Sequence, residues 1–302
     1  MSDAPRIAIL SRQAELYSTR RLLDAVAAAG AEPVLLQPEQ CLLMLNNTQT
    51  QLYYGPSLLA PCVAVIPRVG GPITRLGSRL LRYFAGAGSY CLNSAGALEL
   101  SRDKFASLQS LVAAGVAVPQ TAYFTQVGQR DLAVSALGTP LVHKLLSGSQ
   151  GVGVSLADTP VAARGMLDTF LYLQHEAMVQ RFLPGRQDFR VIVLFDEVIA
   201  AMRREASAED FRSNLHCGGQ ASALPDLPED FAAIACRSAA ALGLGFAGVD
   251  IMLAEDQRPL VLEVNPVPSL EGIEGVTGQD IAATLVKALL QRVLSPSLQP
   301  PL

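Results

Sequence analysis

Short apolar runs alternate with segments of helical apolar spacing over the first ninety residues of the chain. Strand-like runs occupy Arg6–Leu10, Pro33–Leu36 and Val63–Ile66, whereas Tyr17–Ala29 and Thr74–Ala85 have the apolar spacing of amphipathic helices. Because strands that alternate with helices pair in parallel, this region is expected to form a small α/β domain. No Gly-x-Gly-x-x-Gly follows the first strand, so the domain carries no dinucleotide-binding fingerprint.

Beyond residue 90 the pattern changes to hairpins and isolated helices. The predicted strands are Thr121–Phe124, Pro140–Leu146, Ala177–Phe182, Phe189–Leu194, Val198–Arg203, Gly248–Leu253 and Pro259–Asn265. The predicted helices are one that Ser101–Lys104 opens and that runs to Ala114, then Asp131–Ala136, Thr159–Leu173, Pro228–Leu242 and Asp280–Val293. The segment Asn46–Tyr54 fits no predicted element, and the Pro-rich tail 295–302 is expected to be disordered.

The last predicted hairpin carries two carboxylates and an amide on one face. A turn centred on residues 256 and 257 pairs positions whose numbers sum to 513, which puts Asp250 opposite Glu263. Side chains alternate along a strand, so Asn265 shares the face of Glu263. Buried carboxylates need neutralisation, and oxygen ligands suit Mg²⁺ or Mn²⁺. The alternative is that one carboxylate pairs with Arg258.

Two lysines and a glycine-rich loop indicate an anionic ligand. Lys144 lies inside an apolar predicted strand, where an ammonium group requires an anion, and Lys104 lies near the start of a helix. The three glycines of Ser147–Gly153 allow backbone N–H groups to wrap an anion or the loop to close as a lid. The loop is not a Walker A motif, because no Gly-Lys-Ser/Thr follows. The alternatives are surface lysines and an ordinary hairpin turn.

A second polar loop, Phe211–Gly219, contains further candidates. Arg212 has the geometry to clamp a phosphate or a carboxylate through two hydrogen bonds. His216, in the same loop, is equally well explained as a structural hydrogen-bonding residue. Asp188 and Arg190 alternate on a predicted strand and therefore share one side, where they either contact substrate or form a structural ion pair.

Composition and charge exclude several functions. The net charge of −4 gives no reason to expect nucleic-acid binding, and no apolar run is long enough to span a bilayer. Five scattered cysteines and the absence of a signal peptide favour the cytoplasm. His143 and His175 are isolated, and no Ser-His-Asp, cysteine or redox motif appears. The remaining features point to phosphoryl transfer from a nucleoside triphosphate.

The order and spacing of these segments resemble the ATP-grasp ligases of the RimK type, which include the ribosomal-protein glutamate ligases. The resemblance covers roughly residues 6–292 and rests on Ile7–Arg12, Val65–Gly70, Arg102–Lys104, Lys144–Leu145, Gly148–Gly153, Asp210–Gly219, Gly248–Asp250, Glu263–Asn265 and Leu270–Glu274. It implies an α/β protein with α+β lobes. Residues 1–96 would form a Rossmann-like pre-ATP-grasp domain, 97–181 a central lobe with the glycine-rich lid, and 182–294 a C-terminal lobe with the metal site.

The resemblance also assigns roles to individual residues around ATP and two Mg²⁺ or Mn²⁺ ions. The phosphate contacts would be Lys104 and Lys144, with Gly148, Gln150 and Gly151 of the lid. Gln180, Arg181, Phe182 and Leu183 would follow the adenine, and Asp188 would lie near the ribose. Arg212, Ser213 and Asn214 would lie near the phosphates and the reacting carboxylate, with catalytic roles for Arg212 and Lys144. The metal ligands would be Asp250, Glu263 and Asn265.

The reaction implied by the resemblance converts a carboxylate into an acylphosphate, which an amine attacks to give an amide, ADP and phosphate. The expected amine is L-glutamate, and the acceptor is a ribosomal-protein C-terminus or a poly-glutamate chain. A pterin- or furan-type cofactor tail is the alternative acceptor, and a non-catalytic nucleotide-binding protein is the alternative class. Arg181, Cys217 and Pro266–Ser269 depart from the family pattern near the acceptor end. Relatives often form tetramers, so a homo-oligomer is expected.

Overall fold

The computed structural model describes residues 4–146, 153–173, 176–207, 212 and 218–295 of the 302-residue chain. In these residues it contains four sheets: one parallel sheet near the N-terminus, a small hairpin sheet beside it, and two antiparallel sheets further along the chain. The mixed α/β class expected from the sequence is therefore confirmed. No helix in the described ranges is long and apolar enough to cross a membrane.

The N-terminal domain is a doubly wound parallel sheet of strand order β2-β1-β6-β7. Its elements are β1 (Arg6–Leu10), α1 (Tyr17–Ala28), β2 (Glu32–Leu36), β6 (Ala64–Pro67), a 3-10 turn (Gly71–Ile73), α2 (Thr74–Gly86) and β7 (Tyr90–Cys91). Alternate residues of β1 enter two different cores: Ile7 and Ile9 pack with α1, and Ala8 and Leu10 with α2. The helices thus cover opposite faces, as the predicted alternation of strands and helices requires.

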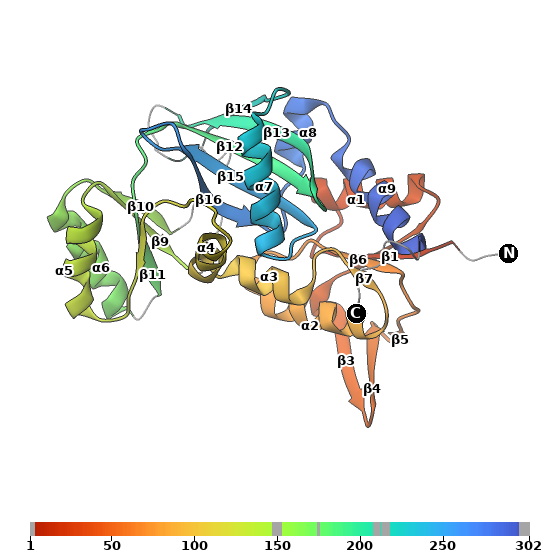
Figure 1. Ribbon diagram of the computed structural model, residues 1–302. Coiled ribbons are helices and arrows are strands. Elements are labelled where there is room, and N and C mark those ends of the chain that lie inside the picture. The colour runs from red at the N-terminus through yellow and green to blue at the C-terminus, as the bar shows by residue number, and fades with distance from the viewer. Residues whose placement is uncertain (1–3, 147–152, 174–175, 208–211, 213–217, 296–302) are drawn as a thin grey trace.

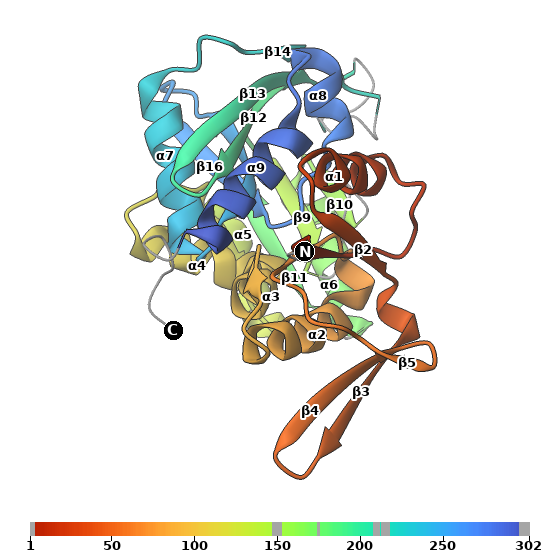
Figure 2. The same ribbon diagram turned by 90° about the vertical axis from the view of Figure 1, so that its right-hand side faces the viewer.

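A hairpin arm projects from this domain (Figures 1 and 2). It follows a short 3-10 turn (Pro38–Gln40) and consists of β3 (Cys41–Asn46), β4 (Gln49–Tyr54) and β5 (Ser57–Leu58), so the segment that the sequence left unassigned is its second strand. The register aligns Leu42, Tyr53 and Leu58 across the three strands. Leu42 is 53% exposed and Leu58 is 55% exposed, and residues 40–67 carry no charged side chain.

The central lobe is an antiparallel sheet of order β10-β9-β11-β8 with two helices on one face. Its elements are β8 (Thr121–Tyr123), α5 (Val127–Leu137), β9 (Leu141–Leu145), β10 (Val154–Ala157), α6 (Pro160–Tyr172) and β11 (Ala177–Arg181). A small core of its own, including Phe124, Val134 and Leu167, holds the helices to the sheet. The helix predicted at Asp131–Ala136 begins one turn earlier, at Val127.

The C-terminal lobe contains a five-stranded antiparallel sheet of order β14-β13-β12-β15-β16. Its elements are β12 (Gln187–Leu194), β13 (Glu197–Glu205), β14 (Gln220–Ala223), α7 (Glu229–Ala241), β15 (Phe246–Leu253) and β16 (Pro259–Asn265). The helices α3 (Ala95–Arg102) and α4 (Lys104–Ala113) precede the central lobe in sequence, yet Leu108 and Leu111 of α4 share a core with α7 and β15.

The helix predicted to open within Ser101–Lys104 and to run to Ala114 is α4, but the sequence prediction missed the separate helix α3, which meets it at Asp103. The Asp103 carboxylate accepts hydrogen bonds from the amides of Phe105 and Ala106 at 3.1 and 2.9 Å. A carboxylate in this position caps a helix start and satisfies amides that have no partner within the helix. The cap places Lys104 at the first position of α4.

The first and last helices of the chain join the N-terminal domain to the C-terminal lobe. The helices α8 (Glu271–Thr277) and α9 (Ile281–Leu294) follow β16, and α9 packs against α1 in a core that also contains residues of β1, β6 and β12. Buried Glu274 accepts hydrogen bonds from the Tyr17 hydroxyl, Arg21 Nε and the Ala282 amide at 2.8, 3.0 and 3.0 Å. These two parts therefore form one packed unit, whereas the central lobe has its own core.

Candidate active site

The β15–β16 hairpin pairs Asp250 with Glu263, as the sequence predicts. Between the turn and Ile251 the paired positions sum to 512, one less than predicted. A bulge between Ile251 and Asp250 then brings the remaining pairs into the predicted register. Val261 and Val264 both enter the buried core although they are three positions apart, so Leu262 and Glu263 both lie outside that core. A bulge of this kind redirects side chains and is common beside active sites. Here it adds one residue to the open face of the sheet.

The carboxylate of Asp250 is bound by two arginines, Arg190 and Arg204. Arg190 Nε and Nη2 donate to the two oxygens of Asp250 at 2.8 and 2.6 Å, and Arg204 Nη2 contacts Asp250 Oδ2 at 3.0 Å. Arg204 also donates to both oxygens of Asp188 at 2.6 and 2.7 Å. Burial would raise the pKa of Asp250, but Arg190 and Arg204 outweigh it and hold that pKa below its usual range. The sequence left open whether Asp188 and Arg190 contact substrate or form structural ion pairs. In the structure both form ion pairs, Asp188 with Arg204 and Arg190 with Asp250.

Glu263 and Asn265 carry oxygen ligands of the kind that a hard divalent cation prefers, whereas both oxygens of Asp250 accept hydrogen bonds from Arg190. Glu263 is exposed, and the described residues give it no ion pair. Asn265 Oδ1 accepts a hydrogen bond from the Val267 amide at 3.0 Å and keeps a second lone pair. The described ranges hold no group of three or more His, Cys, Asp or Glu side chains suited to a metal, and the predicted set of Asp250, Glu263 and Asn265 stays a prediction. Arg258, the alternative partner, pairs with Asp256 at 2.6 Å instead.

Lys144 faces these carboxylates from the central lobe. Its Nζ donates to Gln180 Oε1 at 2.7 Å, and Gln180 Nε2 donates to Thr121 Oγ1 at 2.9 Å, so neighbouring strands β9, β11 and β8 hold the ammonium group in place. Burial lowers the pKa of Lys144, whereas the charges of Glu263 and Asp250 oppose that change. The ammonium group therefore lies within electrostatic reach of both carboxylates. The structural role of the Gln180 side chain is absent from the sequence prediction, which used only its backbone.

Lys104 reaches the same region from the start of α4. Its Nζ donates to the carbonyl oxygen of Leu146 at 3.2 Å, at the end of β9. Burial lowers the pKa of Lys104, and the charge of Glu263 opposes this as it does for Lys144. His143, by contrast, is fully buried and lies 6.2 Å from the Phe170 ring between their centroids, away from these charges.

The stretch predicted to follow the adenine connects the two lobes. The amide of Arg181 donates to Gln120 O at 2.9 Å and that of Phe182 to Pro140 O at 3.1 Å, so both donors are used within the central lobe. Leu183 is partly buried, and its amide has no hydrogen bond among the described residues. Within the described part of the chain Leu183 therefore offers an unused backbone donor, and its contact with adenine stays a prediction.

For several predicted site residues the structure gives no contact that tests the predicted role. Gly148, Gln150 and Gly151 of the lid, and Ser213 and Asn214 of the second polar loop, lie outside the described residues, as do His175, His216 and Cys217. Arg212 is described and partly buried in the connection between β13 and β14. Its predicted contact with phosphate or carboxylate is untested, as is the ribose contact of Asp188.

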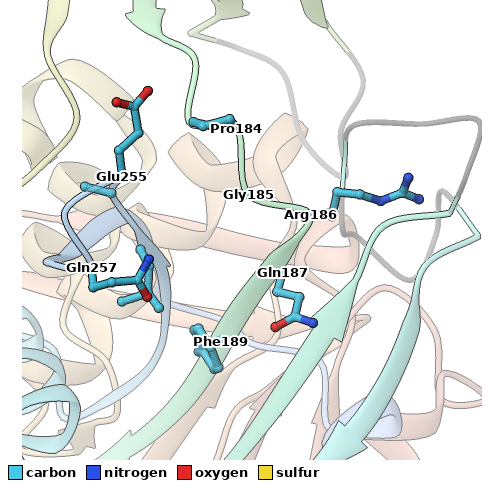
Figure 3. Close-up of a pocket in the computed structure, with 9 residues that line it drawn as sticks. Pro184, Gly185, Arg186, Gln187, Phe189, Glu255 and Gln257 are labelled. Carbon is cyan, nitrogen blue, oxygen red and sulfur yellow. The ribbon is translucent and has the colours of Figure 1, made fainter.

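A hollow of about 440 Å³ lies beside the site, between the chain after β11 and the tip of the β15–β16 hairpin (Figure 3). It is lined by Pro184–Gln187, Phe189 and the hairpin tip, and Arg186 points away from that tip. Phe189 packs with the core that contains α7, whereas Asp188 and Arg190 alternate with it on the opposite face. The hollow is therefore separate from the carboxylate and lysine cluster.

The fold and the site define an enzyme of the ATP-grasp ligase class, which forms C–N bonds with ATP. Residues 101–289 match the RimK-like ATP-grasp domain and residues 6–98 match the RimK pre-ATP-grasp domain, so the chain belongs to the RimK-like ATP-grasp family. "Probable alpha-L-glutamate ligase 2" of Shewanella sp. (strain MR-4) is 42% identical over 292 residues, which cover 96% of this chain and 97% of the relative. A second relative, "Probable alpha-L-glutamate ligase" of Shewanella loihica (strain ATCC BAA-1088 / PV-4), is 41% identical, with 97% of both chains covered.

Solved structures have the same fold. The RimK domain protein ATP-grasp from Sphaerobacter thermophilus DSM 20745 has a TM-score of 0.73 and 26% identity, with 93% of this chain and 98% of that chain covered. The ATP-grasp ligase PsnB, solved with a minimal precursor, has a TM-score of 0.77 and 22% identity, with 95% and 99% covered. The resemblance drawn from the sequence, and the ATP-grasp fold that it implies, are confirmed.

Proposed function

We propose that this protein uses ATP to join L-glutamate to the carboxylate of an acceptor. The observation that carries the proposal is the arrangement of Lys104 and Lys144 opposite Glu263 and Asp250, with the two lysines and the two carboxylates on different elements around one space. The names of the relatives, all probable alpha-L-glutamate ligases, support glutamate as the substrate.

The chemistry proceeds in two transfers. The acceptor carboxylate oxygen forms a bond to the γ-phosphorus of ATP as the β–γ bridging bond breaks, and ADP leaves. The amine of glutamate then attacks the acyl carbon, loses a proton and displaces phosphate, so an amide forms. Lys144, held by Gln180, and Lys104 stabilise negative charge on the transferring phosphoryl group. Mg²⁺ or Mn²⁺ bound by Asp250, Glu263 and Asn265 would supply further positive charge there.

Two classes of acceptor remain after the comparisons. A ribosomal-protein C-terminus or a poly-glutamate chain is the first, and a pterin- or furan-type cofactor tail is the second. Incubation with ATP, Mg²⁺, glutamate and each acceptor, followed by mass spectrometry, tests the proposal directly. We expect ADP together with an acceptor heavier by one or more glutamate residues. If no acceptor from a broad cell extract stimulates ADP formation, the ligase proposal fails and a non-catalytic nucleotide-binding role gains support.

The proposed compartment is the cytoplasm. The four described cysteines, Cys41, Cys62, Cys91 and Cys236, are free thiols, as a reducing environment favours. Burial raises the pKa of Cys91 to about 12, so this thiol stays protonated and unreactive.

The hairpin arm supports the proposed homo-oligomer. Its row of exposed Leu42, partly buried Tyr53 and exposed Leu58 has no charged neighbour within residues 40–67, so two copies of this face can meet without like-charge repulsion. The assembly is predicted to be a tetramer, and Leu42→Asp is expected to convert it into a smaller species. Light scattering measures the molar mass of both proteins. Val161→Asp, at an even more exposed position on α6, serves as the control and should leave the mass unchanged. A monomeric wild-type protein would contradict the proposal.

A further inference from the structure

The parallel sheet of the N-terminal domain changes its winding direction between the neighbouring strands β1 and β6. The chain leaves β1 through α1 to β2 on one side, and leaves β6 through α2 to β7 on the other side. In doubly wound sheets, ligands bind outside the carboxyl ends of the strands at such a change of direction. Arg68 directly follows β6 there, and its amide donates to the carbonyl oxygen of Leu10, the last residue of β1, at 2.8 Å.

Arg68 and Arg102 bring two positive charges to this edge of the sheet. Arg102 ends α3, and its Nη2 donates to the carbonyl oxygen of Val69, the neighbour of Arg68, at 3.0 Å. Its Nε is buried and has no hydrogen-bond partner within the described ranges. Burial first, and the charge of Arg102 second, lower the pKa of Arg68 to about 10. Two partly buried cations of like charge are unfavourable unless an anion joins them.

The planar guanidinium groups of the two arginines suit a substrate carboxylate. The charge of Glu263 acts on Arg102, as it does on Lys104, but no carboxylate of the described residues acts on Arg68. A row of positive charges thus runs from Lys104 and Lys144, the lysines proposed to bind phosphate, to Arg102 and Arg68 in the direction of the N-terminal domain. A planar guanidinium binds a carboxylate through two parallel hydrogen bonds. Incoming glutamate carries two carboxylates, and an acceptor that ends in glutamate also carries two.

We propose that Arg68 and Arg102 bind a substrate carboxylate that is not phosphorylated during the reaction. The inference rests on the proposed function, because both of its substrates are acids. This carboxylate belongs either to the side chain of an acceptor's terminal glutamate or to the incoming glutamate. In both cases the site selects substrates with a second acidic group and holds it away from the phosphoryl group.

Arg68→Met tests this site, with Arg79→Met as the matched control. Arg79 lies exposed on α2 of the same domain, so both variants lose one positive charge. We expect Arg68→Met to raise the KM for one carboxylate substrate about ten- to hundredfold, the loss that a charged hydrogen-bond pair implies, with the KM for ATP unchanged. The thermal midpoint should stay equal or rise, because Met removes a buried charge. A purely structural arginine would instead lower the thermal midpoint.

Two arms identify the source of the carboxylate. The first arm compares acceptor peptides that end in Glu or Gln: a preference for Glu that is lost in Arg68→Met assigns the site to the acceptor. The second arm titrates glutamate: a raised KM for glutamate assigns the site to the incoming amino acid. Unchanged KM values for both, or a loss confined to ATP, overturn the proposal.

Failure of the proposed function gives a different result from failure of this site. If the wild-type protein makes no ADP with any acceptor, binding of glutamate and of tri-glutamate to the wild-type and Arg68→Met proteins is measured by calorimetry. Binding that the variant loses supports the carboxylate site without the ligase reaction. Equal binding by both proteins, or binding by neither, overturns the site as well.

Discussion

Replacement of Glu263 by Gln is expected to lower turnover by about a hundredfold or more while the protein stays folded. Glu263 is exposed, so stability does not depend on its charge, yet that charge acts on both Lys104 and Lys144. The amide keeps the shape of the side chain but removes one negative ligand for the divalent cation. It also lowers the pKa of Lys144 further, so the alkaline limb of the pH–rate profile should move to lower pH. ADP formation measured from pH 6 to pH 10 provides both readouts.

Glu255→Gln is the control for this substitution. Glu255 lies exposed in the turn of the same hairpin, so the variant changes the net charge equally without touching the cluster. Turnover equal to that of the wild type in Glu263→Gln would contradict the proposed metal site in the hairpin. A loss of activity accompanied by a lower thermal midpoint would mean that the residue is structural.

Arg204→Met is expected to lower the free energy of unfolding by about 3–5 kcal/mol at neutral pH, because breaking a buried ion pair leaves uncompensated charge. Arg204 is only 3% exposed and binds Asp188 through two hydrogen bonds and Asp250 through one contact. Its neighbour Arg203 is exposed on the same strand, so Arg203→Met should change stability by less than about 0.5 kcal/mol. Urea unfolding of both variants makes the comparison. Equal stability of the two variants would contradict a structural role for the network.

The loss caused by Arg204→Met should depend on pH. Arg190 and Arg204 hold the pKa of Asp250 below its ordinary value of 3.8, so the pairing contributes fully above that pH. It is lost as the pH falls through the lowered pKa of the folded state, since the unfolded chain binds the proton first. The difference between wild type and variant is therefore expected to be constant near neutrality and to shrink below pH 3.8.

The predictable part of the site follows from local rules. The pairing of Asp250 with Glu263 needs only a turn position and the two-residue period of a strand, and the partial burial of Lys144 needs only an apolar run around it. The capping role of Asp103 was also within reach, because an Asp before a helical run is a start signal. The sequence interpretation placed a helix start within Ser101–Lys104 but missed the separate helix α3 before it.

The unpredicted part depends on contacts between distant strands. The sequence argument assigned the neutralisation of Asp250 to a cation, but Arg190 and Arg204 supply it from residues 60 and 46 positions away along the chain. No periodic pattern encodes which of several arginines will lie across a sheet from a given carboxylate. The bulge at Leu262 is equally invisible, because one extra residue in a strand leaves the local composition unchanged.

The packing of α1 against α9 constrains how the polypeptide can fold during synthesis. Tyr17 and its partner Glu274 are 257 positions apart, so the surface of α1 that packs on α9 stays uncovered until nearly all of these residues have left the ribosome. The central lobe closes its core within residues 124–179 and can form early. An apolar surface exposed for that interval is prone to aggregation, and chaperones bind such surfaces. Production of this protein is therefore expected to be most sensitive to translation that stops before α9 is made.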